Sequence, residues 1–482
     1  MEKINRPNIV VLFPDQHRAD FLGCYGSEFI QTPHIDSLAH TGLRYDRAYS
    51  THPLCVPART ALLTGMNAMR TGVLSNGYFI PPNRTEQGIQ TWPELLSGTG
   101  YHTAAIGKMH FYPWDVDMGF DYRRICEDKR YPLIQDDYSD YLEAQGYKKE
   151  HAQNVPGYQE GKGSMVSHLP ANLSPDHWTG EEACDYIKSR QNSDQPFALM
   201  VGFPGPHDPY DPDDESANLY HPSDMPKAIG LSDDSNLPGM YQNFIDSHKK
   251  DWCGIDYSSL DEHDIGSIRA YYAALVTRID EAVGSIIRTL KEIGQYDNTI
   301  IVYTSDHGDL LGDHGMLGKT LFYESSIRIP MILRGPGIES GVFSNLVSLS
   351  DLTASILEWA GVEKPSVMDS RPLGEGHEYL IGSLFTGWMI DDGRFRLSRY
   401  KTGEVTFFDR HLDPDELNNI AEDKQFACDF RRLDSALQCS VFENLPKGHS
   451  ALKLPGSLYN KQSFGKRRWS RPYPGSKTGP VV

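Results

Sequence analysis

NIVVLF, residues 8–13, is an apolar run that ends at Pro14-Asp15. A strand with one face in water alternates apolar and polar side chains, and this run does not alternate. It therefore predicts a strand that is buried on both faces, as in the interior of a parallel sheet. Similar runs predict further strands at residues 103–106, 197–202, 299–303 and 330–333.

Helical patterns lie between these predicted strands, and the longest runs over about residues 264–293. Its apolar side chains recur at three- and four-residue spacing, and Gly294 suits a helix C-terminus. Strands that alternate with helices predict an α/β fold, with a large, mainly parallel sheet sandwiched by helices. The 482 residues are enough for one large domain and a smaller one.

The chain is predicted to have three parts. Residues 1–370 hold the large α/β domain, residues 371–450 a smaller α+β subdomain with an antiparallel sheet, and residues 451–482 a basic, turn-rich tail. The subdomain is inferred from two short strand patterns, 394–400 and 404–409, with a helical pattern after them.

Two stretches, 112–180 and 205–262, are rich in Pro, Gly, Asp, Tyr and His and show little periodicity. We predict long loops there, placed around a functional site, because binding specificity usually resides in loops on a rigid scaffold.

The overall charge limits the classes of partner. The formal net charge is −19, so the chain is not an obvious nucleic-acid binder, and an anionic substrate would need positive charge from a metal or from a few placed Lys and Arg residues. No apolar run reaches membrane-spanning length, and 9–13 is too short for a signal-peptide core. Seven scattered cysteines without a CxxC pair favour a reducing compartment, and we expect a cytoplasmic protein without a membrane partner.

Two polar pairs, Asp15-Gln16 and Asp306-His307, each come directly after a predicted buried strand. Ligands of open α/β sheets bind at the carboxyl ends of the strands. Two carboxylates, an amide oxygen and an imidazole could together hold one divalent cation, and the oxygen-rich set favours Ca²⁺, Mg²⁺ or Mn²⁺. For either pair taken alone, ordinary turn residues are the better explanation.

A second motif is Cys55-Val-Pro-Ala-Arg59. Pro57 suits the first turn of a helix, which places Cys55 at the helix N-terminus, where free N–H groups and the helix dipole favour an anion. Arg59 lies one turn along and can fold back to the same point. The alternative is that Cys55 is simply a small buried apolar residue.

Four further residues are candidates for binding an oxyanion and for proton transfer. They are Lys108 and His110 in GKMHF, His207 in GPHDP, and Lys319 in GMLGKTLFYE. Each lies in a Gly- or Pro-containing segment near a predicted strand end, where cationic donors and a proton donor can converge on a tetrahedral anion. Taken singly, a residue of this kind is more often a solvated surface residue.

These segments together resemble the formylglycine-dependent (type I) sulfatases of the alkaline phosphatase superfamily. The resemblance spans about residues 7–423, and its most specific element is the Cys-x-Pro-x-Arg motif. The matching segments, in the order of that family, are PNIVVLFPDQ, TPHIDSLAHTGLRYDRAYS, LCVPARTALLTG, GKMH, YYAALVTRIDEAVG, TSDHGDLLGDHGMLGKTLFYE, IPMILRGPG and FFDRHLDPDELNNIAED.

The resemblance implies that Cys55 is oxidised to formylglycine by a formylglycine-generating enzyme. One hydroxyl of the hydrated aldehyde then attacks sulfur and expels the alcohol, and the other loses a proton as sulfate leaves. By the same resemblance, the metal ligands are Asp15, Gln16, Asp306, His307 and the modified Cys55. Arg59 and Lys108 would hold the aldehyde hydrate, His110 would assist its second hydroxyl, and His207 and Lys319 would bind sulfate or protonate the leaving group.

Two features differ from the commonest family pattern. Ala58 stands where serine is usual, and the Asp-Gln and Asp-His pairs replace Asp-Asp and Asp-Asn. Choline-sulfatase-like members and phosphonate monoester hydrolases resemble this version. The imidazole shifts metal preference somewhat toward Mn²⁺, although Ca²⁺ is still favoured.

Three functions are therefore compared. The first is a sulfatase acting on sulfate monoesters of a sugar or other small polar alcohol. The second is a phosphonate monoester or phosphodiester hydrolase on the same scaffold, and the third is a non-catalytic binding protein with an unmodified Cys55. The intact Lys108, His110, His207 and Lys319 argue against the third. The sequence leaves the oligomeric state open, including a homo-oligomer.

Overall fold

The centre of the computed structural model is an eight-stranded sheet in the order β10-β2-β9-β8-β1-β7-β5-β6. The residues described are 6–81, 83–112, 114, 116–127, 129, 134–231, 238–249 and 253–453. The strands of this sheet are β1 (Asn8–Leu12), β2 (Leu43–Tyr45), β5 (His102–Gly107), β6 (Tyr122–Ile125), β7 (Phe197–Gly202), β8 (Thr299–Thr304), β9 (Met331–Arg334) and β10 (Gly341–Phe343).

Strand β1 lies in the interior of the sheet, as the NIVVLF run predicts. It pairs in parallel with β7 on one side and with β8 on the other, and all five of its residues are buried. Strand β9 runs antiparallel to both of its neighbours, β8 and β2. The prediction of a large, mainly parallel sheet is therefore confirmed.

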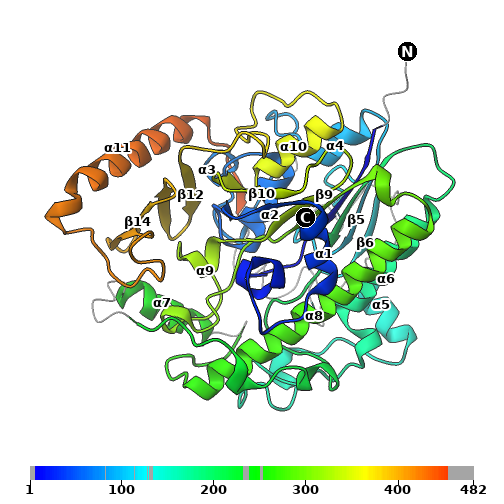
Figure 1. The fold of residues 1–482 in the computed structure, drawn as a ribbon, viewed down its shortest axis with the longest axis horizontal. Coiled ribbons are helices and arrows are strands. Elements are labelled where there is room, and N and C mark those ends of the chain that lie inside the picture. The colour runs from blue at the N-terminus through cyan, green and yellow to red at the C-terminus, as the bar shows by residue number, and fades with distance from the viewer. Residues whose placement is uncertain are drawn as a thin grey trace.

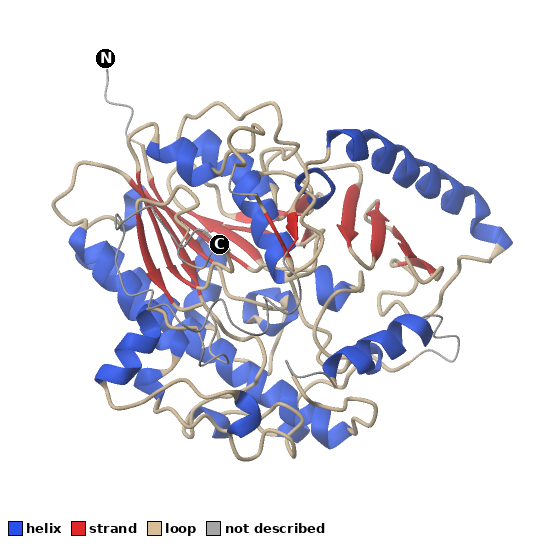
Figure 2. Ribbon diagram, turned by 180° about the vertical axis from the view of Figure 1, so that it is seen from behind, coloured by secondary structure: helices blue, strands red, loops and turns tan. Residues whose placement is uncertain are grey.

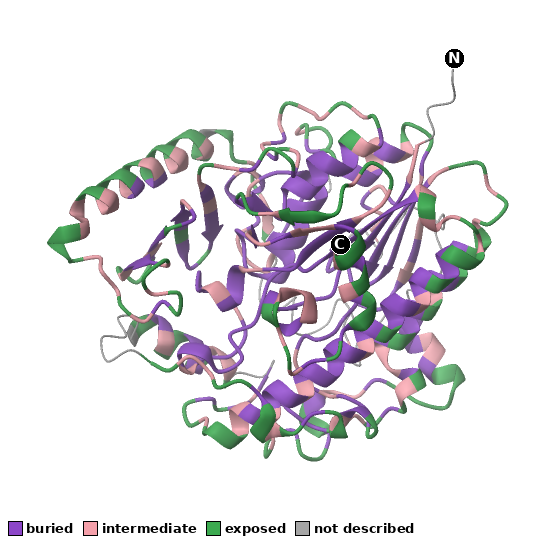
Figure 3. Cartoon of the chain, in the orientation of Figure 1, coloured by how far each residue is buried: buried purple, intermediate pink, exposed green. Residues whose placement is uncertain are grey.

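Helices cover both faces of this sheet (Figures 1 and 2). The side chains of Val10 and Leu12 pack toward α1 (Pro33–Thr41), α6 (Pro175–Ser189) and α8 (Glu262–Glu292). Those of Ile9 and Val11 point to the other face, where α2 (Cys55–Thr64), α4 (Trp92–Ser97) and α10 (Asp351–Trp359) pack. Figure 3 shows the strands as buried and the outer faces of α6 and α8 as partly exposed. None of the described helices is long and apolar enough to cross a membrane.

A second, antiparallel sheet comes later in the chain, and α11 (Ala427–Asn444) packs on one of its faces. The other face contributes Met389, Tyr400 and Phe408 to a core shared with the large domain. This sheet lies inside the range 371–450 expected for a subdomain, while the boundary at residue 370 stays a prediction. Its strands are β12 (Leu380–Leu384), β13 (Gly387–Asp391), β14 (Phe395–Tyr400) and β15 (Val405–Asp409).

Ion pairs connect this sheet to helix α9 (Glu324–Ile327) of the large domain. The Glu324 carboxylate lies 2.8 Å from Arg396 and 2.6 Å from Arg410. Arg396 also pairs with Asp391 at 2.7 Å and with Glu416 at 2.5 Å, and all three of these side chains are buried. The Glu324 backbone N–H donates to Glu416 as well. The link is therefore electrostatic as well as apolar.

The prediction of long loops at 112–180 and 205–262 is wrong in part. These stretches contain β6, α5 (Asp137–Ala144), the start of α6 and α7 (Pro238–His248). Helix α6 begins where the Ser174 side chain accepts the His177 N–H and Pro175 occupies the first turn, which is a common helix start. Its many polar residues hide the apolar period that carried the other helix predictions.

Several further short elements lie in the described chain. They are β3 (Ala48–Tyr49), β4 (Tyr78–Phe79), α3 (Ala68–Thr71), β11 (Val347–Ser348) and β16 (Leu452–Lys453). Strand β16 pairs with β4, which ties the start of the predicted tail to the large domain. The rest of that tail, 454–482, lies outside the described residues.

Candidate active site

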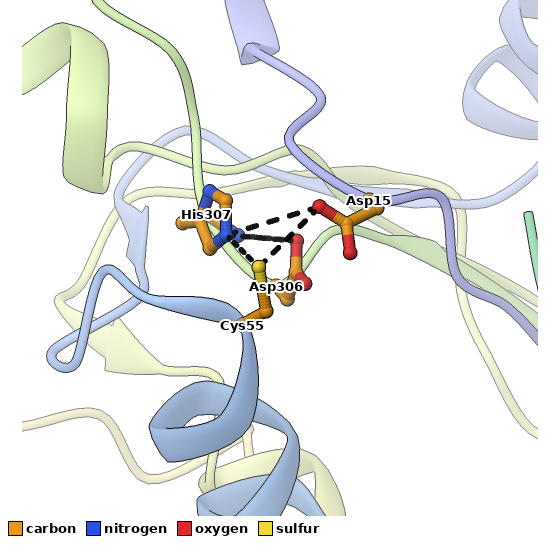
Figure 4. Close-up of side chains that lie close together, drawn as sticks. All are labelled: Asp15, Cys55, Asp306 and His307. Carbon is orange, nitrogen blue, oxygen red and sulfur yellow. Dashed lines mark hydrogen bonds and ion pairs between the residues drawn. The ribbon is translucent and has the colours of Figure 1, made fainter. Parts of the chain in front are cut away.

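Four potential ligand atoms meet at the carboxyl edge of the large sheet (Figure 4). Asp15 lies just beyond β1, and Asp306 and His307 lie just beyond the neighbouring β8, so parallel pairing brings them together. Cys55 enters from the other side as the first residue of α2. One side-chain atom from each of the four lies within 4.8 Å of all the others, and all four residues are buried. This is the edge at which α/β sheets bind ligands.

Each carboxylate of the cluster has one oxygen engaged by a cation. Arg59 contacts Oδ2 of Asp15 at 3.0 Å and Oδ2 of Asp306 at 2.9 Å, and Lys108 Nζ lies 3.0 Å from Oδ2 of Asp15. The Oδ1 atoms lie nearer to the histidine, at 3.9 Å for Asp15 and 3.7 Å for Asp306 from His307 Nε2. The cations therefore fix the carboxylates and leave an oxygen of each directed into the cluster.

His307 presents an unprotonated nitrogen to the same point. Its Nδ1 is 2.9 Å from the carbonyl oxygen of Gly308, which can only accept, so the ring proton is assigned to Nδ1. Burial lowers the pKa of His307, which keeps the ring neutral. A neutral imidazole whose other nitrogen is held by a carbonyl is the usual form of a metal ligand.

The charge state of Asp15 also suits a cation. Burial alone would raise its pKa, but the nearby cations Lys108 and Arg59 hold the pKa of this carboxyl well below its usual range. The cluster thus offers an ionised carboxylate, a second carboxylate and a neutral imidazole within one small buried volume. This donor set fits a single divalent cation.

The Cys55 thiol is a poor nucleophile in this environment. Burial, together with the charge of Asp15, raises its pKa to about 11, although Lys319 and Lys108 oppose the shift. The thiolate is the reactive form of cysteine, so the unmodified side chain stays protonated near neutral pH. The backbone N–H of Val56, the next residue, donates to Asn76 Oδ1 at 3.0 Å.

Lys319 and His207 form a second group beside the cluster. Lys319 Nζ is 2.7 Å from His207 Nε2 and donates to the side-chain oxygen of Gln16. The Nδ1 of His207 lies 2.7 Å from the carbonyl oxygen of Asp208, so Nδ1 carries the proton and Nε2 accepts from the ammonium. The pair is therefore poised to move a proton between an amine and an imidazole.

Comparisons with known proteins agree with this geometry. Residues 7–362 match the sulfatase family. The chain belongs to the sulfatase family. It is 29% identical to an arylsulfatase of Clostridium perfringens, over 87% of this chain and 91% of that protein. It is 26% identical to an N-acetylglucosamine-6-O-sulfatase of Bacteroides thetaiotaomicron, over 88% of this chain and 84% of that protein.

A solved structure shows the same fold. The phosphonate monoester hydrolase of Agrobacterium radiobacter superposes with a TM-score of 0.77 over 91% of this chain and 96% of that one, at 22% identity. Membership of this family makes the protein a hydrolase of sulfuric esters. The cluster of Asp15, Cys55, Asp306 and His307 is the candidate metal centre of this sulfatase.

Two residues predicted for the site stand differently from the rest. Gln16 of the sulfatase donates its backbone N–H to Asp306 Oδ1 at 2.9 Å, but its side-chain oxygen accepts from Lys319 and its amide donates to Asp309. His110 lies two residues after Lys108, beyond β5, and its ring stacks on Trp114 at 5.5 Å between centroids. The roles predicted for the site residues all stay predictions, and for Gln16 as a ligand and His110 in proton transfer the described contacts add no support.

Two buried acids next to this site were missed in the sequence. Asp309 accepts from Gln16 and Tyr210 on one oxygen, and on the other from the backbone N–H of Gly318, the residue before Lys319. Glu127, beyond β6, accepts the backbone N–H of Met109 at 3.4 Å. Asp309 comes soon after the Asp306-His307 pair in TSDHGD, so this signal was present. Glu127 comes after YRRIC, a strand too polar to be recognised.

Proposed function

We propose that the protein hydrolyses sulfate monoesters of a sugar or another small polar alcohol, using formylglycine made from Cys55 and one divalent metal. One observation carries the proposal. Cys55 Sγ, at the first residue of α2, lies 3.3 Å from His307 Nε2 and 3.8 Å from Asp15 Oδ1. A nucleophile derived from this residue would therefore stand directly at the candidate metal centre.

The donor set fits the metal that this family requires. Asp15, Asp306 and His307 would hold the ion, with Gln16 and the modified Cys55 completing the shell. Oxygen ligands favour Ca²⁺, while the imidazole keeps Mn²⁺ and Mg²⁺ as alternatives. When present, the metal would supply positive charge for the sulfuryl oxygens and the formylglycine hydrate would supply the attacking hydroxyl.

The other side chains have roles that are consistent with their contacts. Arg59 and Lys108 contact the Asp15 carboxylate, so they would fix the positions of this metal ligand and of the formylglycine at position 55. His110 would assist the second hydroxyl. Lys319 and His207 share a 2.7 Å contact, and they would bind sulfate oxygens and give a proton to the leaving alcohol oxygen.

The sugar is the finer part of the proposal. The Bacteroides relative is named for an N-acetylglucosamine 6-O-sulfate, which supports a saccharide substrate for this chain. Formation of the nucleophile would require a formylglycine-generating enzyme as partner. The competing function is hydrolysis of phosphonate monoesters or phosphodiesters, which share tetrahedral shape and a single negative charge with a sulfate monoester.

A paired substrate panel tests the proposal. Metal-loaded enzyme, co-expressed with a formylglycine-generating enzyme, is assayed on sulfated monosaccharides, choline sulfate, aryl sulfates, phosphonate monoesters and phosphodiesters, with Cys55→Ala as the blank. We expect the highest kcat/KM for a sulfate ester, with a sulfated sugar above the aryl sulfates. If a phosphonate or phosphodiester exceeds every sulfate by about tenfold, roughly 1.4 kcal/mol of transition-state preference, the competing function replaces this one.

A further inference from the structure

Two segments of the chain border the residues around Cys55. In the first, Asn76 accepts the backbone N–H of Val56, the residue after Cys55. In the second, Thr320, the residue after Lys319, donates its backbone N–H to the carbonyl of Pro53 at 3.2 Å. Asn76 and Thr320 are both partly exposed, so these segments form part of the rim of the site.

The turn between β12 and β13 joins the two segments. The backbone N–H of Phe385 donates to the carbonyl of Leu74 at 2.9 Å. The hydroxyl of Thr386, the next residue, donates to the carbonyl of Thr320 at 3.0 Å. The C-terminal sheet thus contributes this turn directly to the rim.

An exposed cation from the β14–β15 turn lies over an exposed aromatic ring of the β12–β13 turn. Phe385 is 42% exposed, and Lys401 Nζ lies 4.8 Å from the centroid of its ring. The backbone N–H of Lys401 donates to the carbonyl of Thr386 at 2.9 Å, which fixes the base of the side chain. Lys401 forms no ion pair within the described part of the chain. The carboxylate closest in sequence, Glu404, accepts instead from Thr402 and Gly239.

A cation held in this way is suited to a second anion. The Phe385 ring restrains the Lys401 ammonium group, and the N–H donors of that ammonium group stay available to a ligand. The chain has 65 acidic and 46 basic residues, so its surface as a whole repels anions. A positive group at the rim would provide local attraction for an anionic substrate.

We propose that Lys401, positioned by Phe385, binds a second anionic group of the substrate, a sulfate or carboxylate that lies beyond the reacting ester. The inference rests on the proposed function in that the same site takes the sulfated sugar, and it names the class more closely. Preferred substrates are saccharide sulfates with at least two negative charges.

The test compares two sugars that differ in one charge. Binding of N-acetylglucosamine 6-sulfate and N-sulfoglucosamine 6-sulfate is measured by calorimetry on metal-loaded Cys55→Ala protein. We expect the disulfated sugar to bind more tightly. Lys401→Gln should lower the ratio of the two affinities roughly threefold to fivefold, and Lys401→Glu by about tenfold or more.

A matched control lies at the opposite edge of the sheet. Lys291 is exposed and sits 4.7 Å from the ring centroid of Tyr296, just before β8 begins. Lys291→Gln should leave the affinity ratio unchanged, because it removes the same charge far from the site.

Three outcomes would overturn the inference: a ratio that Lys401→Gln and Lys401→Glu leave unchanged, a ratio that Lys291→Gln lowers equally, or failure of both sugars to bind. Turnover of the two sugars by Cys55 enzyme is measured separately. If neither sulfate is hydrolysed while Lys401 still sets the affinity ratio, the sugar part of the proposed function fails and the anion-binding role of Lys401 stands.

Discussion

His307 Nε2 lies 3.3 Å from Cys55 Sγ, although the two residues are 252 positions apart in the chain. The contact joins the end of a central strand to the start of a helix on one face of the sheet. The Nδ1 proton of His307 is directed to a backbone carbonyl. The Nε2 atom, which faces the sulfur, therefore carries a lone pair. Cys55 and the candidate metal ligands are therefore parts of one arrangement.

The first prediction concerns Cys55. Protein co-expressed with a formylglycine-generating enzyme should carry an aldehyde or its hydrate at this position, detected by peptide mass spectrometry. Cys55→Ala should reduce turnover to background while leaving metal content in place, since Asp15, Asp306 and His307 remain. Full activity of Cys55→Ala would remove Cys55 from the mechanism.

The second prediction concerns the metal. Asp306→Ala should abolish stoichiometric binding of a divalent cation and most turnover, because the remaining ligands would not offset the cost of dehydrating the ion. Metal content is measured by elemental analysis of the purified variant. Asp297→Ala is the control, since Asp297 is exposed and lies at the opposite edge of the sheet. Unchanged stoichiometry in Asp306→Ala would refute the ligand assignment.

The third prediction concerns Lys319. As a group that stabilises charge while the ester bond breaks, it should contribute to kcat as well as to KM, and Lys319→Ala should lower kcat about a hundredfold on an alkyl sulfate. The loss should be smaller on an aryl sulfate, whose leaving group needs less protonation. Steady-state kinetics on both esters provide the measurement. A rise in KM alone would make Lys319 a ground-state binder.

The fourth prediction concerns stability and pH. Glu127 is buried, one of its oxygens has no hydrogen-bond partner, and burial raises its pKa to about 7 from 4.5, against the opposing charges of Arg123, Lys108 and Arg59. Because the folded-state pKa is the higher one, the folded protein binds this proton more tightly. The resulting stability is present below pH 4.5 and is lost as the pH rises through 7.

Glu127→Gln removes this titration. The free energy of unfolding of the variant relative to the wild type should therefore increase by about 2.5 kcal/mol between roughly pH 5 and pH 8. Urea unfolding of both proteins at the two pH values measures this difference. The titration of the other buried acids, which both proteins share, cancels in the comparison. Parallel changes in the two proteins would show that Glu127 does not titrate in this range.

The sequence predicted the features that depend on continuous apolar runs and on the polar residues at their ends. The NIVVLF run predicted a central strand. Asp15, Asp306 and His307 follow two buried strands, and they were predicted to lie together because the strand ends of a parallel sheet share one edge. Helix α6 was missed, since its start depends on the Ser174 cap and not on apolar spacing. The contacts of Gln16 were also out of reach, because Lys319 and Asp309 approach it from about 300 residues away.

The ion pairs around Glu324 have a consequence for how the protein can be divided. The acid lies on α9, a short way beyond Lys319, and two of its three arginine partners, Arg396 and Arg410, come from the small antiparallel sheet and its edge. A chain cut at residue 370 would remove Arg396 and Arg410 from this carboxylate and expose the apolar face that the sheet covers. Heating should accordingly melt both parts in one calorimetric peak. An exchange of the sheet with that of a relative must therefore keep arginines at positions 396 and 410.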